Sequence, residues 1–290
     1  MQAIGGQAVI EGVMFKSRRG WAVAVRGQDG SIRLKLEPLT THRSEKVPLL
    51  RGTFILFYTL LLGIRALEFS AQVSSDEEKP VSPLAMGLTL FLSFAVAIGL
   101  FLFLPLYLTR LIGFIFPLVA KTGWLFNLVD GLIRVGLFLL YIGIVGLWKE
   151  MARVFEYHGA EHKVIHAYEA GELSMERIKA QSPRHPRCGT SFLLIVMVVS
   201  ILVFSFIPQH WPLYFKFLSR IVLIPFVAGI SYETLKLSAK YQKNPLMRLL
   251  VLPGLALQRL TTREPDEKQL EVSLRAFKEV MSLEGPNETA

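Results

Sequence analysis

The chain has 290 residues, of which 52% are hydrophobic and only 19% are charged. Soluble domains carry about 25% charged residues; the deficit here is concentrated in long apolar segments, which indicates a protein embedded in lipid rather than a large soluble core. The formal net charge of +9 comes from Lys and Arg residues that flank those segments. Such a distribution is typical of cytoplasmic loops beside anionic lipid headgroups, and no nucleic-acid-binding motif accompanies it.

The cysteine content and the first residues indicate the compartment. The single cysteine, Cys188, excludes an internal disulfide and is compatible with a reducing environment. The first twenty residues lack a continuous apolar core, so we expect no cleavable signal peptide and expect the first crossing helix to direct insertion.

Residues 1–48 are predicted to form a cytoplasmic, β-rich element. Two strand-like runs, 21–26 and 32–36, flank a turn that contains Asp29-Gly30, which is a strong hairpin signal. Glycines 5, 6 and 12 are interpreted as turn residues, with an anion-binding nest of backbone N–H groups as the alternative.

The next segment, 49–82, is interpreted as an interfacial helix followed by a polar linker. Its apolar part, 49–68, carries Arg51 near one end and Arg65 near the other. The stretch between these arginines is too short to cross a bilayer comfortably. We therefore predict a helix in the cytoplasmic interface with its arginines at headgroup level, and a true crossing is the alternative.

Four later segments are predicted to cross the membrane, and two of them carry charges. Asp130 and Arg134 are interpreted as an i,i+4 pair near the interface, with a proton or substrate pathway as the alternative. Lys216 and Arg220 must snorkel to the interface or find partners. The predicted crossings are residues 84–108, 126–148, 191–207 and 213–235.

The expected architecture is an all-α polytopic membrane protein with a small N-terminal β element and cytoplasmic interfacial helices. The loop between the second and third crossings is rich in Lys and Arg, so it and both termini are predicted to be cytoplasmic. Residues 265–283 have helical periodicity and are expected to pack on the cytoplasmic face. Four further units are expected after 1–48 and 49–82. They are the first two crossings (83–148), a His-rich cytoplasmic loop (149–190), the last two crossings (191–235) and a cytoplasmic helical tail (236–290).

The His-rich loop contains four of the six histidines. On a helix, His158, His162 and His166 fall within about 80° of one another, and Glu161 and Glu169 lie on the same face. Imidazoles one turn apart can converge on one divalent ion, whereas a solvated face would more often use Lys and Glu. The alternative is a polar helix with hydrogen-bonded histidines.

A five-residue pattern within this helix suggests a zinc enzyme. His158-x-x-Glu161-His162 matches the H-x-x-E-H arrangement, in which two histidines bind Zn²⁺ and the glutamate serves as general base. Such enzymes need a third protein ligand, typically a distant Glu. Glu233 is the candidate, because it is expected near the cytoplasmic end of the fourth crossing.

A second ligand set lies closer in sequence. His185 and Cys188 have the i,i+3 spacing of a chelating pair, and imidazole and thiolate suit Zn²⁺. Two histidines with Glu233 would leave a position for water and form a catalytic site, whereas histidines with His185 and Cys188 would form a closed structural site. A nucleophilic Cys188, activated by neighbouring arginines, is a further alternative.

Several motifs of the chain carry a family resemblance. The chain resembles the YqhQ-like family of bacterial membrane proteins, whose members are labelled as predicted metal-dependent enzymes. The resemblance implies a bacterial cytoplasmic membrane location and metal-dependent activity. Its carriers are Gly5-Gly6-Gln7-Ala8-Val9-Ile10-Glu11-Gly12-Val13-Met14, His158-Gly159-Ala160-Glu161-His162-Lys163, His185-Pro186-Arg187-Cys188-Gly189-Thr190-Ser191-Phe192, and Pro253-Gly254-Leu255 with Leu260-Thr261-Thr262.

The expected function is therefore a zinc-dependent membrane hydrolase, with Glu161 as the catalytic base. The alternative is a membrane scaffold or transport component with a structural zinc site or no metal. The expected partners are the lipid bilayer with anionic headgroups and a second copy or another membrane protein. The substrate could be a peptide, a lipid or a small amphiphile.

Overall fold

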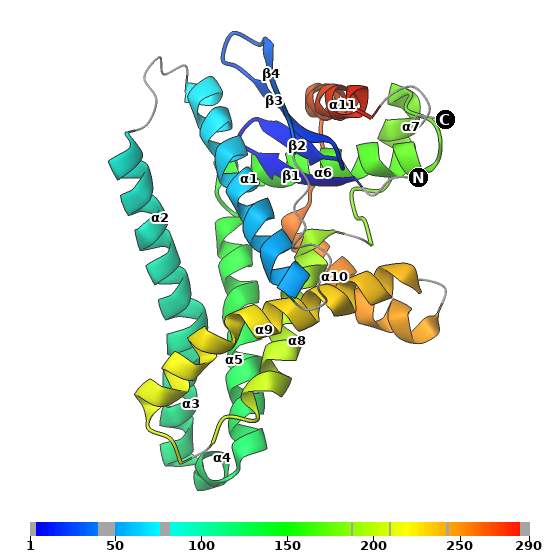
Figure 1. Ribbon diagram of the computed structural model, residues 1–290. Coiled ribbons are helices and arrows are strands. Elements are labelled where there is room, and N and C mark those ends of the chain that lie inside the picture. The colour runs from blue at the N-terminus through cyan, green and yellow to red at the C-terminus, as the bar shows by residue number, and fades with distance from the viewer. Residues whose placement is uncertain are drawn as a thin grey trace.

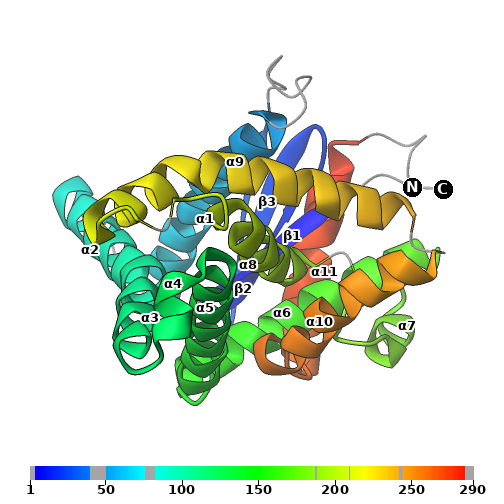
Figure 2. The ribbon, with the colours of Figure 1, turned by 90° about the horizontal axis from the view of Figure 1, so that it is seen from below.

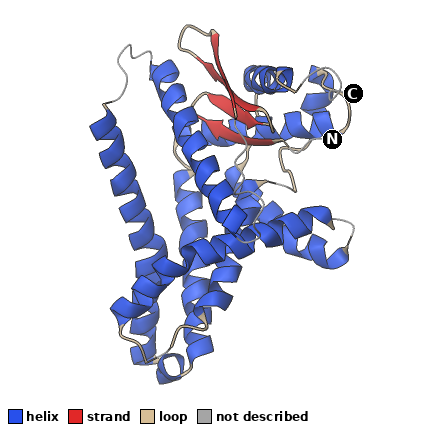
Figure 3. Ribbon diagram, viewed as in Figure 1, coloured by secondary structure: helices blue, strands red, loops and turns tan. Residues whose placement is uncertain are grey.

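The computed structural model describes residues 4–39, 50–75, 82–186, 188–208, 210–241 and 244–284. A small antiparallel sheet lies at one end of a mostly helical molecule (Figure 3). The predicted helical membrane protein with an N-terminal β element is confirmed.

The sheet has four strands in the order β1-β2-β3-β4. They are β1 (Gly5–Val9), β2 (Gly12–Lys16), β3 (Gly20–Arg26) and β4 (Ile32–Pro38). The turn between β3 and β4 contains Gly30 with φ of 79°, a left-handed conformation that glycine adopts without steric cost. The hairpin predicted from Asp29-Gly30 is therefore present.

Both faces of this sheet are covered by helices. One face packs on α1 (Leu50–Ser75), and the other packs on α6 (Lys149–Glu169) and α11 (Glu267–Ser282). Figure 1 shows the strands between α1 and α11. Because successive side chains of a strand point to opposite faces, β3 contributes Trp21, Val23 and Val25 to the α1 side and Ala22 and Ala24 to the other.

Within the described residues, four helical segments are long and apolar enough to cross a membrane, so the chain is a multi-pass membrane protein. The second of them is continuous through α2 (Pro83–Ile98), the π-helical turn η2 (Gly99–Phe103) and α3 (Leu104–Ile115). The third is α5 (Gly123–Val145) and the fourth belongs to α9 (Leu213–Lys240). The four segments are Arg51–Ser75, Leu84–Ile115, Gly123–Val145 and Leu213–Ser238.

The number four agrees with the prediction, but one member of the set differs. The helix α1 continues without interruption to Ser75, beyond the predicted interfacial segment 49–68, and its length and composition would allow it to cross, which was the alternative; its C-terminal part, however, packs Leu62, Ala66 and Val73 on the sheet. Conversely, the predicted crossing 191–207 corresponds to α8 (Gly189–Phe204), which has 16 residues. A spanning helix needs about 20.

The short helix α8 is nevertheless central to the bundle. It contacts α5, α9 and α10 (Pro245–Thr261), and an end-on view shows it among these three helices (Figure 2). Two short helices complete the fold, α4 (Pro117–Lys121) before α5 and α7 (Met175–Ala180) after α6. Consequently, the N-terminus of α8 lies where the bundle meets the unit formed by the sheet, α6 and α11.

Candidate metal centre

The helix α6 carries the histidines on the face opposite to its core contacts. Tyr157, Ala160 and Val164 pack into the hydrophobic core with the sheet and α11. The helix ends at Glu169, where Ala170 caps it and Gly171 follows with φ of 82°. The histidine face therefore turns toward the segment that leads into α8.

Two backbone carbonyl groups fix the orientation of two imidazoles. Nδ1 of His158 lies 2.8 Å from the carbonyl oxygen of Thr261, and Nδ1 of His162 lies 2.6 Å from that of Pro183. Since a carbonyl can only accept a hydrogen bond, each Nδ1 donates its N–H, and in the neutral tautomer that this selects the lone pair is on Nε2. Metal-binding histidines are held in this way by outer partners.

The imidazoles of these two histidines lie close to Cys188. Nε2 of His158 lies 3.2 Å from Sγ of Cys188, and single ligand atoms of His158, His162 and Cys188 all lie within 4.8 Å of one another. Nε2 of His162 is buried and has no hydrogen-bond partner in the described part of the chain. Buried polar atoms are rarely left without partners, and a metal ion would satisfy this lone pair.

Cys188 is held at the beginning of α8. Its Sγ accepts a hydrogen bond from the backbone N–H of Thr190 at 3.4 Å and lies 3.2 Å from the Thr190 hydroxyl. Burial raises the pKa of the Cys188 thiol, although both contacts with Thr190 lower it. A neutral thiol is therefore favoured without a cation, whereas metal binding favours the thiolate.

Glu161 lies beside the triad formed by His158, His162 and Cys188 and is almost fully buried. Its Oε2 is 4.0 Å from Nε2 of His158. Burial raises the pKa of Glu161 to about 8, and the neighbouring His158 only partly offsets that effect. A buried carboxyl group with a pKa near neutrality can exchange protons at physiological pH.

The strand β1 covers the Glu161 carboxyl group. A Cβ atom on Gly6 would lie 2.6 Å from the Glu161 side chain, whereas one on Gly5 would meet nothing within 4 Å. The interpretation of these two glycines as turn residues was wrong, because both belong to β1. Gly6 instead allows the strand to approach the carboxyl group closely.

The remaining predicted ligands form a second, adjacent group. Nε2 of His185 lies 3.3 Å from Oε2 of Glu169, and Nε2 of His166 lies 2.9 Å from the Arg184 carbonyl oxygen. Ligand atoms of His166, Glu169 and His185 also lie within 4.8 Å of one another. The rings of His162 and His185 are 5.8 Å apart between centroids, so the predicted single cluster is two neighbouring groups.

The prediction of Glu233 as third ligand was wrong. Its carboxylate is engaged by Arg51 of α1, with Nε–Oε1 and Nη2–Oε2 distances of 2.7 and 2.5 Å. The two parallel N–H groups of a guanidinium match both carboxylate oxygens. Glu233 therefore joins α9 to α1, and Cys188 stands where the sequence pattern suggested a glutamate.

Sequence reasoning missed the residues that support the site. Gln258 is fully buried, accepts from the backbone N–H of His185 at 2.8 Å and donates to the carbonyl of His185 at 2.9 Å. A lone glutamine within the apolar run of α10 is a signal that could have identified it. The carbonyl groups of Pro183 and Thr261 could not have been identified, since any residue type offers one.

Comparison with known proteins identifies the family. A profile described as "Protein of unknown function (DUF1385)" matches residues 47–283. The "Uncharacterized protein YqhQ" of Bacillus subtilis (strain 168) is 37% identical over 306 aligned positions, which cover 99% of this chain and 94% of that protein. The chain belongs to the DUF1385 family. No solved structure matches it.

The charges of the triad and of the neighbouring Glu161 in this DUF1385 protein fit a divalent cation. Burial, with smaller contributions from the neighbouring His158 and other histidines, lowers the pKa of His162 to about 2, so its imidazole is neutral. An ionised Cys188 and Glu161 would place two negative charges in a buried site, which is costly unless a cation compensates them. One divalent metal ion would balance both.

Proposed function

We propose that this DUF1385 protein is a zinc-dependent integral membrane enzyme, a hydrolase whose metal is held by His158, His162 and Cys188. The observation that carries the proposal is the buried Nε2 of His162, which has no hydrogen-bond partner among the described residues, in an imidazole that offers a ligand atom within 4.8 Å of those of His158 and Cys188. The carbonyl groups that hold both Nδ1 atoms support the same assignment.

The proposed chemistry divides between the metal and Glu161. A bound zinc ion would supply Lewis acidity, which polarises a carbonyl or ester group and acidifies water. Three protein ligands leave one coordination position open, as in catalytic zinc sites. Glu161 takes a proton from water at its carboxylate and returns it to the leaving group, a role that suits its raised pKa.

The position of the site suggests the kind of substrate. The triad lies at the beginning of α8, between the unit that contains the sheet and the apolar bundle. The surrounding loop is rich in Lys and Arg, which supports a location on the cytoplasmic face of a bacterial cytoplasmic membrane, with both termini cytoplasmic. A substrate that combines a polar, hydrolysable group with an apolar part, such as a lipid or a membrane peptide, fits this boundary.

A closed structural zinc site is the second candidate. The 4.0 Å separation of Glu161 Oε2 from His158 Nε2 favours it, because a small shift would make Glu161 a fourth ligand. The protein would then be a membrane scaffold rather than an enzyme. The two candidates differ in whether a coordination position remains open.

Cobalt substitution tests for an open position without knowledge of the substrate. Purified protein loaded with Co²⁺ would be titrated with acetohydroxamate while its visible absorption spectrum is recorded. The enzyme proposal predicts a saturable spectral change, because the hydroxamate enters the open position. An unchanged spectrum in fully loaded protein would contradict the enzyme proposal and favour the closed site.

Glu161→Gln serves as the matched variant. In the enzyme proposal Glu161 is not a ligand, so the variant should still load fully with Co²⁺ and should still respond to acetohydroxamate. In a closed site the variant should lose Co²⁺ affinity by about 10-fold or more, since an amide is a poorer ligand than a carboxylate.

A further inference from the structure

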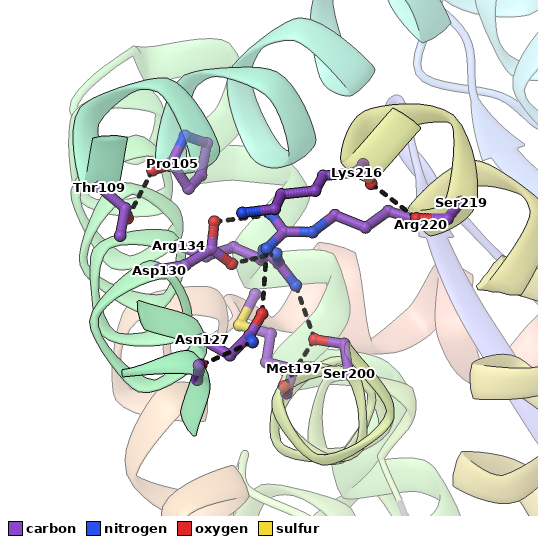
Figure 4. A network of polar contacts seen from close by, with 11 residues as sticks. Pro105, Thr109, Asn127, Asp130, Arg134, Met197, Ser200, Lys216, Ser219 and Arg220 are labelled. Carbon is purple, nitrogen blue, oxygen red and sulfur yellow. Dashed lines mark hydrogen bonds and ion pairs between the residues drawn. The ribbon is translucent and has the colours of Figure 1, made fainter. Parts of the chain in front are cut away.

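A second buried polar site lies inside the helical bundle, in the half farther from the sheet (Figures 1 and 4). Asp130 of α5 accepts hydrogen bonds from Nη2 of Arg134 and from Nη1 of Arg220 of α9, both at 2.7 Å. The residues are 2%, 6% and 1% exposed, in that order. The predicted i,i+4 pair is present, but it lies within the bundle and includes Arg220.

The two guanidinium groups retain hydrogen-bonding capacity. Nη1 of Arg134 donates to Ser200 of α8 at 2.7 Å, and Nη2 of Arg220 donates to Asn127 at 3.3 Å. The ring of Phe204 lies 5.1 Å from each guanidinium carbon. A guanidinium has five N–H donors, and the Nε atoms of both arginines are buried with no partner in the described segments.

Positive charge exceeds negative charge at this site. The ammonium group of Lys216, a third cation, lies 4.6 Å from the centre of the Phe126 ring. Asp130 is the only acidic residue between positions 84 and 148, and the only one of α9, Glu233, pairs with Arg51. Unbalanced charge within an apolar bundle is costly, so a bound anion would stabilise this site.

The cations continue from the buried site toward the surface. Arg220 is the most buried, Lys216 is 9% exposed, and Arg110 of α3 is exposed and close enough to Lys216 to interact electrostatically. Guanidinium groups bind phosphate oxygens through paired N–H donors. We propose that Arg134, Arg220 and Lys216 form a binding site for a phosphate group that enters past Arg110.

Either a lipid headgroup or free phosphate could supply this group, and a titration separates them. Purified full-length protein in neutral detergent would be titrated with phosphatidylglycerol, with phosphatidylcholine and with inorganic phosphate, while the midpoint of thermal unfolding is recorded. A rise with phosphatidylglycerol alone supports the site and assigns a lipid source. If inorganic phosphate also raises the midpoint, the free anion is sufficient as the ligand. If neither phosphatidylglycerol nor inorganic phosphate raises the midpoint, the proposal is contradicted.

Two variants with the same change of charge show whether binding is local. Lys216→Gln removes the outermost of the three cations and should weaken binding of the active ligand roughly five-fold. Lys121→Gln removes an exposed cation of α4 at the same end of the bundle and should leave binding unchanged. Equal effects of the two variants would mean general surface attraction and would overturn the proposal.

Discussion

Single backbone carbonyl groups determine which nitrogen of each histidine can bind a metal. His158 and His162 both present Nε2 because Nδ1 of each faces a carbonyl oxygen. His162→Gln should therefore weaken zinc binding at least about 100-fold, more than the loss of an outer partner does. His210→Gln, on an exposed turn at the far end of the bundle, is the matched control. Competition with a calibrated chelator measures both, and equal affinities would rule out His162 as a ligand.

Close packing at one glycine fixes the strand that covers the Glu161 carboxyl group. Gly6→Ala would place a Cβ atom 2.6 Å from the Glu161 side chain, and overpacking of this kind costs about 1–3 kcal/mol. The midpoint of thermal unfolding should fall by several degrees. Gly5→Ala, one residue earlier on the same strand, meets nothing within 4 Å and should be nearly neutral. If both variants melt alike, β1 does not cover Glu161.

Much of the candidate site could be predicted from the residue types and their spacing, but its third ligand could not. The pattern of His158, Glu161 and His162 on one helix face follows from helix geometry alone. The choice between Glu233 and Cys188 depends on contacts between segments distant in sequence, where Arg51 captures Glu233. Sequence spacing does not reveal such competition, so both alternatives stood open.

At the level of elements, α6 packs against the segment that directly follows α10, which contains Arg263. The backbone N–H of Arg263 donates to the carbonyl of Phe155 at 2.9 Å, and a Cβ on Gly159 would lie 2.0 Å from the Arg263 carbonyl oxygen. Gly159→Ala should separate the two segments, withdraw the Thr261 carbonyl from His158 and weaken zinc binding about 10-fold or more.

The matched control for that change is Gly136→Ala in α5, where a Cβ would meet nothing within 4 Å. It should leave zinc affinity unchanged and stabilise α5 slightly, because alanine favours helix over glycine. Isothermal titration of both metal-free variants with zinc provides the comparison. Unaltered affinity in Gly159→Ala would show that α6 does not need this contact to hold the metal ligands.

The elements themselves were predictable where local signals are strong. The Asp29-Gly30 hairpin and the amphipathic α11 follow from turn chemistry and periodicity. The length of α1 could not be predicted in this way. Its C-terminal part packs Leu62, Ala66 and Val73 on the sheet rather than facing lipid alone. An apolar residue that faces a protein core and one that faces lipid look the same in sequence.

At the scale of the whole molecule, the basic loops predict which side of the membrane each end faces. In a Cys188→Ser background, a cysteine at Glu176, in exposed α7, should be protected from a membrane-impermeant maleimide in intact cells. A cysteine at exposed His210 should react. Labelling in the reverse pattern would place the metal centre outside the cytoplasm and contradict the orientation.

Zinc X-ray absorption of the purified protein tests the central claim most directly. The account predicts one zinc per chain with two nitrogen ligands at about 2.0–2.1 Å and one sulfur ligand at about 2.3 Å. The sulfur contribution should disappear in Cys188→Ser. Protein without stoichiometric metal, or a zinc signal with no sulfur neighbour, would contradict the assignment of His158, His162 and Cys188 as a metal centre.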